Sequence, residues 1–279
     1  MNSIEQQTTR LAEWNIQSGG FEGYDPTAET PQYLSDIKEG IQQLNAAFVS
    51  LIDTYRWEEL YTPEELKKMF GYNHAFCINL EDNRLENLGH NNGITVLSNL
   101  DVKKFETVYI KTRNAVKTTL QVHEKPLDIF SVYLDDVREK TRLEQMGALL
   151  QHVTPDRRTI IIGDFNCISD RDVALIEKTM KTILQNLPQK MRTRFYSVKE
   201  KLAHRGAIRF LEAKGFIDAA VEREPTTPTH KIYSIIPPFL RLDYAFCTSD
   251  IVVVSTDVVR GELFNRISDH FPLIVEIES

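Results

Sequence analysis

Two short polar strings in this 279-residue chain lie directly beside runs of branched apolar residues. Residues 163–166, Gly-Asp-Phe-Asn, follow an apolar run, and residues 268–270, Ser-Asp-His, precede one. Such runs predict buried strands. A carboxylate at the end of a buried strand is costly unless a metal ion, another cation or hydrogen-bond donors compensate for the lost water. The two strings therefore predict one polar centre at the edge of a sheet, with metal-assisted hydrolysis as its chemistry.

Other strand ends add to this centre. Asn15 lies in the first apolar strand, Asp53 ends the next, and Asp243 lies at the start of a later one. Asp164 and Asn166 are two residues apart, which places both side chains on one face of an extended segment. Alone, Asn15 could cap a turn and Asp53 could be a helix N-cap. Together these groups are hard oxygen ligands with one imidazole, a set that suits Mg²⁺ or Mn²⁺ rather than zinc.

The elements that must position these groups alternate along the whole chain. Apolar runs predict strands at 10–16, 47–52, 93–97, 105–111, 127–134, 159–163, 242–247, 251–254 and 273–277. Apolar stripes at helical spacing predict helices at 34–44, 143–153 and 176–187. Residues 19–26 and 225–238 read as loops at the mouth of the site. Many strands with a few helices between them predict an α/β fold, with sheets covered by helices in one domain over residues 1–279.

Composition limits the class of protein. The hydrophobic share of 42% and the charged share of 26% are ordinary for a globular protein. No apolar run approaches the length needed to span a bilayer, and the first residues do not resemble a signal peptide. Cys77, Cys167 and Cys247 have neither disulfide-framework nor zinc spacing. We therefore expect a cytoplasmic protein.

The distribution of charge leaves two interpretations open. A net charge of −7 argues against nucleic-acid binding through the overall field of the protein. The segment 178–214 is nevertheless basic, and it is either a solvated helix pair or a surface that tracks phosphates. Its cations are Lys178, Lys181, Lys190, Arg192, Arg194, Lys199, Lys201, Arg205, Arg209 and Lys214.

The order of the motifs is that of one known family. An Asn in the first strand and an acid ending the next are followed by Gly-Asp-x-Asn at 163–166, Leu-Asp-Tyr at 242–244 and Ser-Asp-His-x-Pro at 268–272. In this the chain resembles the endonuclease/exonuclease/phosphatase superfamily, the deoxyribonuclease-I-like hydrolases, from Leu11 to Ile277. The resemblance implies a four-layer α/β sandwich with two central, mostly antiparallel β-sheets flanked by helices.

The resemblance also implies a metal site. Asp53 corresponds to the acidic metal ligand, and Asn15 and Asp269 would help to hold Mg²⁺ or Mn²⁺ directly or through water. The ion would neutralise phosphate charge and stabilise the departing oxygen.

The remaining motif residues are implied to act on water and phosphate. Asp164 would position or deprotonate the attacking water, and Asn166 would donate to a phosphoryl oxygen. His270 would bind the phosphate or act as the base, oriented by Asp243. A carboxylate partner fixes the imidazole tautomer and favours its protonated form.

Two positions depart from the family pattern. Many members have Gln-Glu where this chain has Ile52-Asp53. Many also have a catalytic histidine where this chain has Tyr133, although the AP-endonuclease branch has a tyrosine there. A phenol can donate to a phosphate oxygen, but Tyr133 could also be an ordinary strand residue.

Three further residues are expected at the substrate. Arg142, in the helix after Tyr133, either supports the active-site strand or meets a phosphate. Asn92 precedes a strand that borders the site in the family. His230 lies in the loop before Asp243 and is expected to touch the substrate.

The sequence thus predicts a divalent-metal-dependent phosphoester hydrolase, and the leading hypothesis for its substrate is nucleic acid, DNA or RNA. The alternative is a small-molecule or lipid phosphoesterase of the inositol phosphate or sphingomyelin type. A catalytically inactive binding module on the same fold is the rival from another class. The oligomeric state is not predicted.

Overall fold

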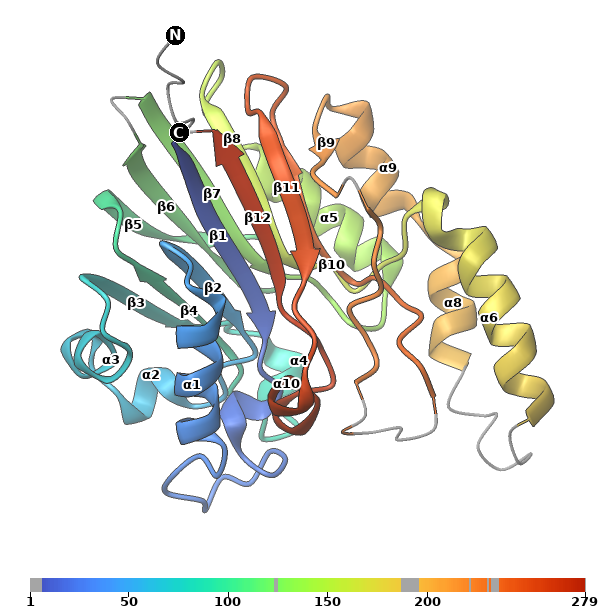
Figure 1. The fold of residues 1–279 in the computed structure, drawn as a ribbon, viewed down its shortest axis with the longest axis horizontal. Helices are drawn as coiled ribbons and strands as arrows, with labels where there is room; N and C mark the ends of the chain where they lie inside the picture. Colours follow the sequence, from blue (N-terminus) through green and yellow to red (C-terminus); the bar gives the residue numbers. More distant parts are fainter. Residues whose placement is uncertain are drawn as a thin grey trace, which may run out of the picture.

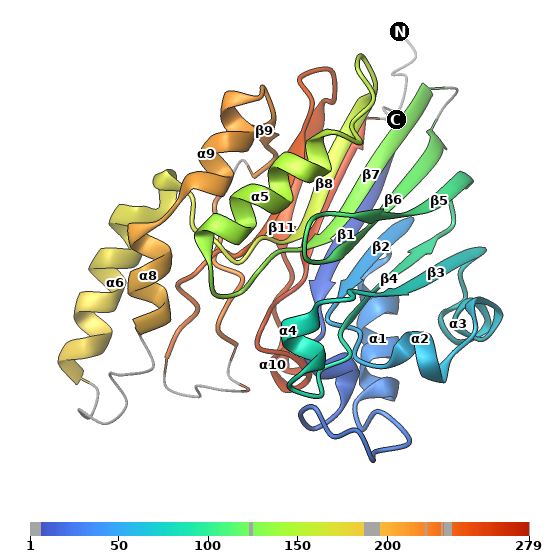
Figure 2. The same cartoon turned by 180° about the vertical axis from the view of Figure 1, so that it is seen from behind.

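The strands form two six-stranded sheets that face each other in the centre of the molecule (Figures 1 and 2). The computed structural model describes residues 7–122, 125–186, 196–220, 222–229, 231 and 236–278. The first sheet, in spatial order, is β11 (Val253–Val258), β12 (Leu273–Glu278), β1 (Thr8–Asn15), β2 (Phe48–Ile52), β4 (Gly93–Ser98) and β3 (His74–Asn79). The second is β5 (Asp101–Tyr109), β6 (Asn114–Val122), β7 (Lys125–Tyr133), β8 (Arg158–Asp164), β10 (Asp243–Cys247) and β9 (Ile217–Asp218).

Helices cover the outer faces of both sheets. On the first sheet lie α1 (Leu34–Leu44), α2 (Trp57–Leu60), α3 (Pro63–Phe70) and α10 (Glu262–Ile267). On the second lie α5 (Glu139–Leu150) and α9 (Gly206–Ala213), with α6 (Val173–Asn186) and α8 (Tyr196–Ala203) beside them (Figure 2). The short elements are α4 (Asn83–Glu86), η1 (Ser18–Gly20) and η2 (Asp170–Asp172). In the described part of the chain, no helix is long and apolar enough to cross a membrane.

Alternation along the strands explains the layers. In β8, Ile160 and Ile162 point into the core between the sheets, whereas Ile161 points outward into the core that includes Met146 of α5 and Leu211 of α9. A strand buried on both faces reads as a continuous apolar run, because successive side chains point to opposite faces. The expected four-layer α/β sandwich is confirmed.

Each sheet contains a single parallel pair at its centre, β1 with β2 and β7 with β8, and its other described pairs are antiparallel. Parallel neighbours need a crossover, which α1 and α5 provide. The carboxyl ends of parallel strands lie at the same edge of their sheet. Asn15 and Ile52 are therefore paired at this edge of the first sheet, and Tyr133 and Asp164 at the corresponding edge of the second sheet. The candidate site lies where these two edges meet.

The strand predictions overlap nine of the observed strands, but β3, β6 and β9 were not predicted. In β6 the buried positions alternate with Lys117, Thr119 and Gln121, so the strand lacks an apolar run. In β3 the apolar run is only four residues long, between His74 and Asn79, and β9 has only two residues. These strands lie at or near the sheet margins, where one face need not be apolar.

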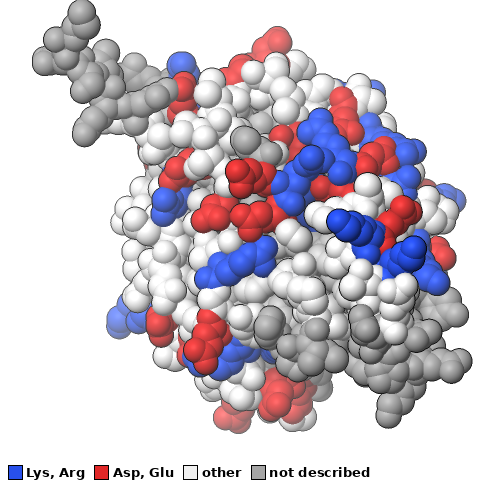
Figure 3. All heavy atoms as spheres, turned by 45° about the vertical axis from the view of Figure 1, so that its right-hand side comes forward, with Lys and Arg blue, Asp and Glu red and all other residues white. Residues whose placement is uncertain are grey.

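Among the described cations of the basic segment only Lys201 is buried, and Lys178, Lys181, Lys199, Arg209 and Lys214 are exposed. Arg205 Nε and Arg209 Nε pair with Asp170 at 2.6 and 2.5 Å, and Lys201 is only 8% exposed. Figure 3 shows Lys and Arg on this side of the molecule interspersed with Asp and Glu. Lys190, Arg192 and Arg194 lie outside the described residues. The described part of the segment therefore favours the helix-pair interpretation over a continuous phosphate-tracking surface.

Gly163 generates a prediction about the fold, because it is paired with Val132 of β7 and leaves no room for a side chain there. Its φ is 151°, and an added Cβ would lie 1.9 Å from the Val132 carbonyl oxygen. Gly163→Ala should therefore lower the free energy of unfolding by about 3 kcal/mol or more in chemical denaturation. The matched control is Gly147→Ala in α5, where a Cβ meets nothing within 4 Å. That change should raise stability by roughly 0.5–1 kcal/mol. Equal stability of the two variants would contradict the prediction.

Candidate active site

Asp164, the last residue of β8, is the group around which the site is organised. Its Oδ2 accepts a hydrogen bond from Asn15 Nδ2 at 3.0 Å, which joins the two sheets. Its Oδ1 accepts from the Asn166 backbone N–H at 2.8 Å, and its Oδ2 also accepts from Asn166 Nδ2 at 3.2 Å. Burial and the nearby carboxylate of Asp243 raise the pKa of Asp164 to about 6, against the lowering effect of His270. The structure thus brings Asn15, Asp164 and Asn166 together, as expected.

Asp243 and His270 form a second buried unit. Asp243 pairs with Asp164 across the antiparallel β8–β10 ladder, so the two carboxylates are neighbours. His270 Nδ1 lies 2.8 Å from Asp243 Oδ2, and the Trp14 indole N–H donates to the His270 carbonyl at 3.1 Å. Burial lowers the pKa of His270, but Asp243 and Asp269 outweigh it and raise that pKa well above 6.5. The imidazole is therefore an oriented cation at neutral pH.

Asp53 follows β2 and lies at the edge of the first sheet with its carboxylate surrounded by donors. Its Oδ2 accepts from the Ser18 N–H at 3.0 Å and from the Tyr24 hydroxyl at 2.7 Å. Its Oδ1 accepts from Asn92 Nδ2. Burial raises the pKa of Asp53 to about 7, although the bonds from Ser18 and Tyr24 lower it and Asp269 raises it further. The predicted residue Asn92 thus touches Asp53, and Tyr24 is a partner that sequence reasoning did not identify.

Tyr133 ends β7 beside these acids. The Arg113 guanidinium carbon lies 4.8 Å from the centre of its ring, and Arg113 Nη1 donates to the Tyr133 carbonyl at 3.1 Å. Burial, Asp53 and other nearby acids raise the pKa of Tyr133 well above 10. The phenol therefore keeps its proton, which leaves it able to donate a hydrogen bond.

One of the expected substrate residues, Arg142, does not join this group. Arg142 is 2% exposed; its Nε pairs with Glu139 at 2.8 Å, and its Nη1 donates to the Asp135 carbonyl at 2.7 Å. These contacts hold the loop after β7. They favour the interpretation that Arg142 supports the active-site strand over the interpretation that it contacts a phosphate. His230 lies outside the described residues.

Glu13 is a member of the site that sequence reasoning missed. It is 0% exposed in β1, and both of its carboxylate oxygens lack a hydrogen-bond partner among the described residues. Burial, followed by Asp243 and Asp164, raises the pKa of Glu13 well above its ordinary value, while His270 lowers it. The signal was present, because a glutamate two residues before Asn15 points to the same face of the strand.

The donor set fits a divalent cation. Asp53 and Asp164 are each 2% exposed, and among the described residues neither forms an ion pair with Lys or Arg. Two buried carboxylates without a cation are unfavourable, and the raised pKa values are the sign of this cost. Asp164, Asp243 and His270 lie together, with an oxygen or nitrogen atom of each within 4.8 Å of the others, but a protonated His270 is not itself a metal ligand. Carboxylate and amide oxygens suit Mg²⁺ or Mn²⁺.

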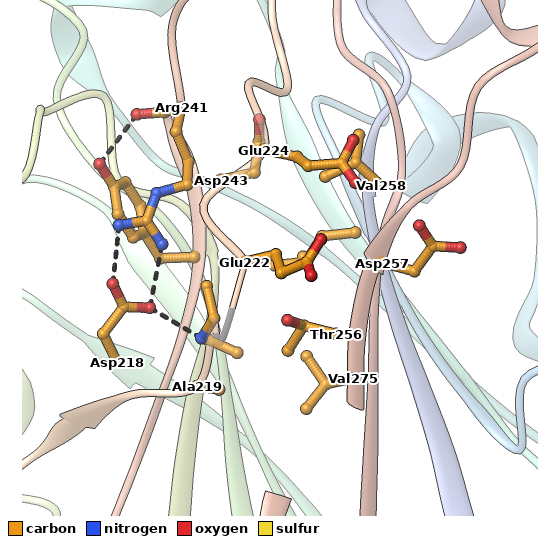
Figure 4. Close-up of a pocket in the computed structure, with 14 residues that line it drawn as sticks. Asp218, Ala219, Glu222, Glu224, Arg241, Asp243, Thr256, Asp257, Val258 and Val275 are labelled. Carbon is orange, nitrogen blue, oxygen red and sulfur yellow. Dashed lines mark hydrogen bonds and ion pairs between the residues drawn. The ribbon is translucent and has the colours of Figure 1, made fainter. Parts of the chain in front are cut away.

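A narrow cavity adjoins this centre behind Asp243, between β10 and β11 (Figure 4). Its space is about 10 Å³, roughly that of one water molecule. Three of its charged groups are used in ion pairs: Arg241 pairs with Asp218 at 2.7 Å, and Glu224 pairs with Arg260 at 3.1 Å. The cavity is therefore too small and too internally paired to hold a substrate.

The Asp243–His270 pair generates a prediction for metal-free protein. Asp243→Asn should lower the pKa of His270 towards or below 6.5, because burial then opposes the imidazolium with less compensation. Proton NMR titration of the imidazole measures this, with the signal assigned by its loss in His270→Ala. The control Asp250→Asn changes an exposed acid and should leave the titration unaltered. A His270 pKa unchanged by Asp243→Asn would contradict the pairing.

Comparison with known proteins identifies the family. The sequence profile of the Endonuclease/Exonuclease/phosphatase family matches residues 12–270. No curated protein matches the sequence significantly. The fold is similar to that of an AP endonuclease from Archaeoglobus fulgidus, with a TM-score of 0.68 and 14% identity over 97% of this chain and 100% of that one.

Two other solved structures show the same architecture. A mannosyl-6-phosphatase from Bacteroides thetaiotaomicron VPI-5482 has a TM-score of 0.60 and 14% identity over 96% of this chain and 99% of that one. A humanized D. rerio TDP2 has a TM-score of 0.58 and 15% identity over 98% and 99%. At these low identities the TM-scores show a shared fold and nothing more, whereas the profile match shows the family. The chain belongs to the Endonuclease/Exonuclease/phosphatase family, whose members are hydrolases that act on phosphoester bonds.

Proposed function

We propose that this protein hydrolyses phosphoesters by in-line attack of water, with a divalent cation as cofactor. The observation that carries the proposal is the pair of buried carboxylates, Asp53 and Asp164, that face the same edge of the sandwich without a Lys or Arg ion pair among the described residues. A bound Mg²⁺ or Mn²⁺ would neutralise phosphate charge and stabilise the departing oxygen. Asp53, Asn15 and Asp269 are the residues proposed to hold it.

The side chains around Asp164 suit the attacking water. The carboxylate of Asp164 is held by Asn15 and Asn166, so its direction is determined before substrate binds. With a pKa of about 6 it is mostly ionised at neutral pH yet basic enough to accept a proton. We assign to Asp164 the positioning and deprotonation of water.

The opposite charge is supplied by the histidine. His270 remains protonated because Asp243 lies against its Nδ1. An imidazolium binds a phosphoryl oxygen well and is a poor base. We therefore assign His270 to phosphate binding, with Asn166 and the Tyr133 phenol as further donors to phosphoryl oxygens.

The substrate class is proposed in two alternatives. Nucleic acid comes first, because Tyr133 matches the tyrosine of the AP-endonuclease branch and an AP endonuclease shares the fold. A small-molecule or lipid phosphoester is the second, because Lys201 is buried and Arg205 and Arg209 are already paired with Asp170. Salt separates the two: contacts to several phosphates make affinity fall steeply with salt, whereas one phosphate gives a shallow dependence.

The activity is tested by hydrolysis of a phosphoester panel with Mg²⁺, with Mn²⁺ and with EDTA. The panel contains plasmid DNA, abasic and single-stranded oligonucleotides, RNA, sphingomyelin, inositol phosphates and sugar phosphates. We expect metal-dependent cleavage that falls by roughly 10²–10⁴-fold in His270→Ala and in Asp164→Ala. The control His152→Ala removes an exposed histidine outside the site and should retain the wild-type rate. Wild-type rates in both site variants would overturn the assignment.

Tyr24 generates a second prediction, on metal affinity. Tyr24→Phe removes the hydroxyl that donates to Asp53 at 2.7 Å and lowers its pKa. The variant should bind Mn²⁺ about 10–100-fold more weakly at pH 7 in calorimetry, the usual cost of losing a partner that orients a ligand. Tyr109→Phe, at an exposed tyrosine of β5, is the matched control. Unchanged affinity in Tyr24→Phe would remove Asp53 from the proposed metal site.

A further inference from the structure

Lys201 is a buried lysine whose ammonium reaches the candidate active site. It lies in α8 and is 8% exposed, in a segment whose composition suggested surface lysines. Its Nζ donates to the Asn166 carbonyl at 2.6 Å, to Asn166 Oδ1 at 3.1 Å and to the Asp136 carbonyl at 3.1 Å. Burying an ammonium is costly unless its donors are all used. Here three acceptors satisfy them, so the position of the ammonium is well determined.

The two loops that Lys201 joins both leave strands of the second sheet at the site. Asn166 lies just after the end of β8, and Asp136 follows the end of β7. The Asp136 side chain accepts from Arg113 at 3.2 Å, and Arg113 lies over the Tyr133 ring. Lys201 therefore connects Asn166 to Asp136, and through Asp136 to Arg113, the residue that packs on Tyr133.

The ammonium also determines which way the Asn166 amide faces. Lysine carries donors only, so it can meet the amide oxygen but not the amide NH₂. With Oδ1 against Lys201, Nδ2 must point the other way, where it donates to Asp164 Oδ2 and the Leu134 carbonyl, each at 3.2 Å. Rotation of the amide by 180° would place two donors together and remove both of these bonds. The backbone of Asn166 adds to the constraint, because its φ of 50° is uncommon for a residue other than glycine.

The position of the ammonium is in turn set by the packing of its helix. Val198 of α8 lies in a small apolar core with Ile176 and Met180 of α6 and with Leu240 and Leu242 near β10. Lys201 is one turn further along α8 from Val198. The α6–α8 pair, which lies to one side of the sandwich in Figure 1, is therefore connected to the site through Lys201.

We propose that Lys201 is a positioning residue for phosphoester hydrolysis, which orients the amide of Asn166 so that its NH₂ donates to Asp164, the carboxylate proposed to position and deprotonate the attacking water. The inference rests on the proposed function and adds to it a residue from outside the motifs. Lys201 acts through Asn166 and does not itself touch the substrate. Its loss should lower turnover and leave substrate affinity largely intact.

A double-mutant cycle between Lys201→Met and Asn166→Ala tests this. With Asn166 present, Lys201→Met should lower kcat by roughly 10–100-fold with KM changed less than about threefold, because the carboxylate of Asp164 loses a donor that fixes its direction. In Asn166→Ala, the same change should alter kcat by less than about threefold. Equal losses in both backgrounds would show a general structural effect and overturn the proposal. The control Lys140→Met removes an exposed lysine of α5 and should have no effect.

A second measurement does not need a substrate. In NMR spectra of ¹⁵N-labelled wild-type protein, the Asn166 side-chain NH₂, assigned by its loss in Asn166→Ala, should exchange slowly with water. In Lys201→Met it should exchange at least tenfold faster, whereas Lys140→Met should leave it unchanged. Unchanged exchange in Lys201→Met would overturn the proposal. Absence of hydrolysis in the wild type, with the exchange effect present, would overturn the proposed function while leaving the positioning intact.

Folding of the variant is the remaining control. If thermal unfolding shows that Lys201→Met does not fold, Lys201→Gln retains N–H donors without the charge. It should fold, lose less activity than predicted for Met, and show the same dependence on Asn166. A loss in Lys201→Gln that is equal with and without Asn166 would overturn the proposal.

Discussion

The site depends on the burial of a carboxylate, Asp164, at the meeting point of two sheets. A buried carboxylate must be surrounded by donors, and those of Asp164 come from both sheets: Asn15 from β1 and Asn166 from the loop after β8. Satisfying one side chain therefore sets how the sheet edges meet. Gly163, the residue before Asp164, has no Cβ, which lets β8 lie close to Val132 of β7. The same strand therefore sets the contact between β7 and β8 and the position of the Asp164 carboxylate.

Acids and one imidazole lie close together in the site. Burial is the main cause that raises the pKa values of Asp53, Asp164 and Glu13. His270 lies against Asp243, with a ring nitrogen within 4.8 Å of a carboxylate oxygen of Asp164, and its protonated form is favoured. A phosphoester has both an anionic oxygen that binds cations and a leaving oxygen whose developing charge a metal ion can stabilise. An acidic pocket beside an oriented imidazolium, once it holds a divalent cation, offers both, which is the physical basis of the proposed hydrolysis.

The shorter acid at position 53 illustrates how a departure from the family pattern is accommodated. Asp53 is one methylene shorter than glutamate, yet its carboxylate is held by the Ser18 N–H, the Tyr24 hydroxyl and Asn92. Tyr24 comes from the loop after β1, stacked on His90 at 3.9 Å between ring centres. The loop was recognisable from its glycines, but the contact between Tyr24 and Asp53 was not, because 29 residues separate them and no periodicity relates them.

Local chemistry was sufficient to recognise the strand ends and the residues attached to them. Asp164, Asn166 and His270 stand next to apolar runs, and the central strands bury both faces, so their runs are continuous. Sequence patterns report neighbours along one element and are silent on contacts between elements. Lys201 was therefore indistinguishable from the solvated lysines around it, and its contact with Asn166, 35 residues away, arises only when α8 packs against α6 and the residues before β10. Because Lys201 is buried, its ammonium bonds to Asn166 at the site instead of facing water.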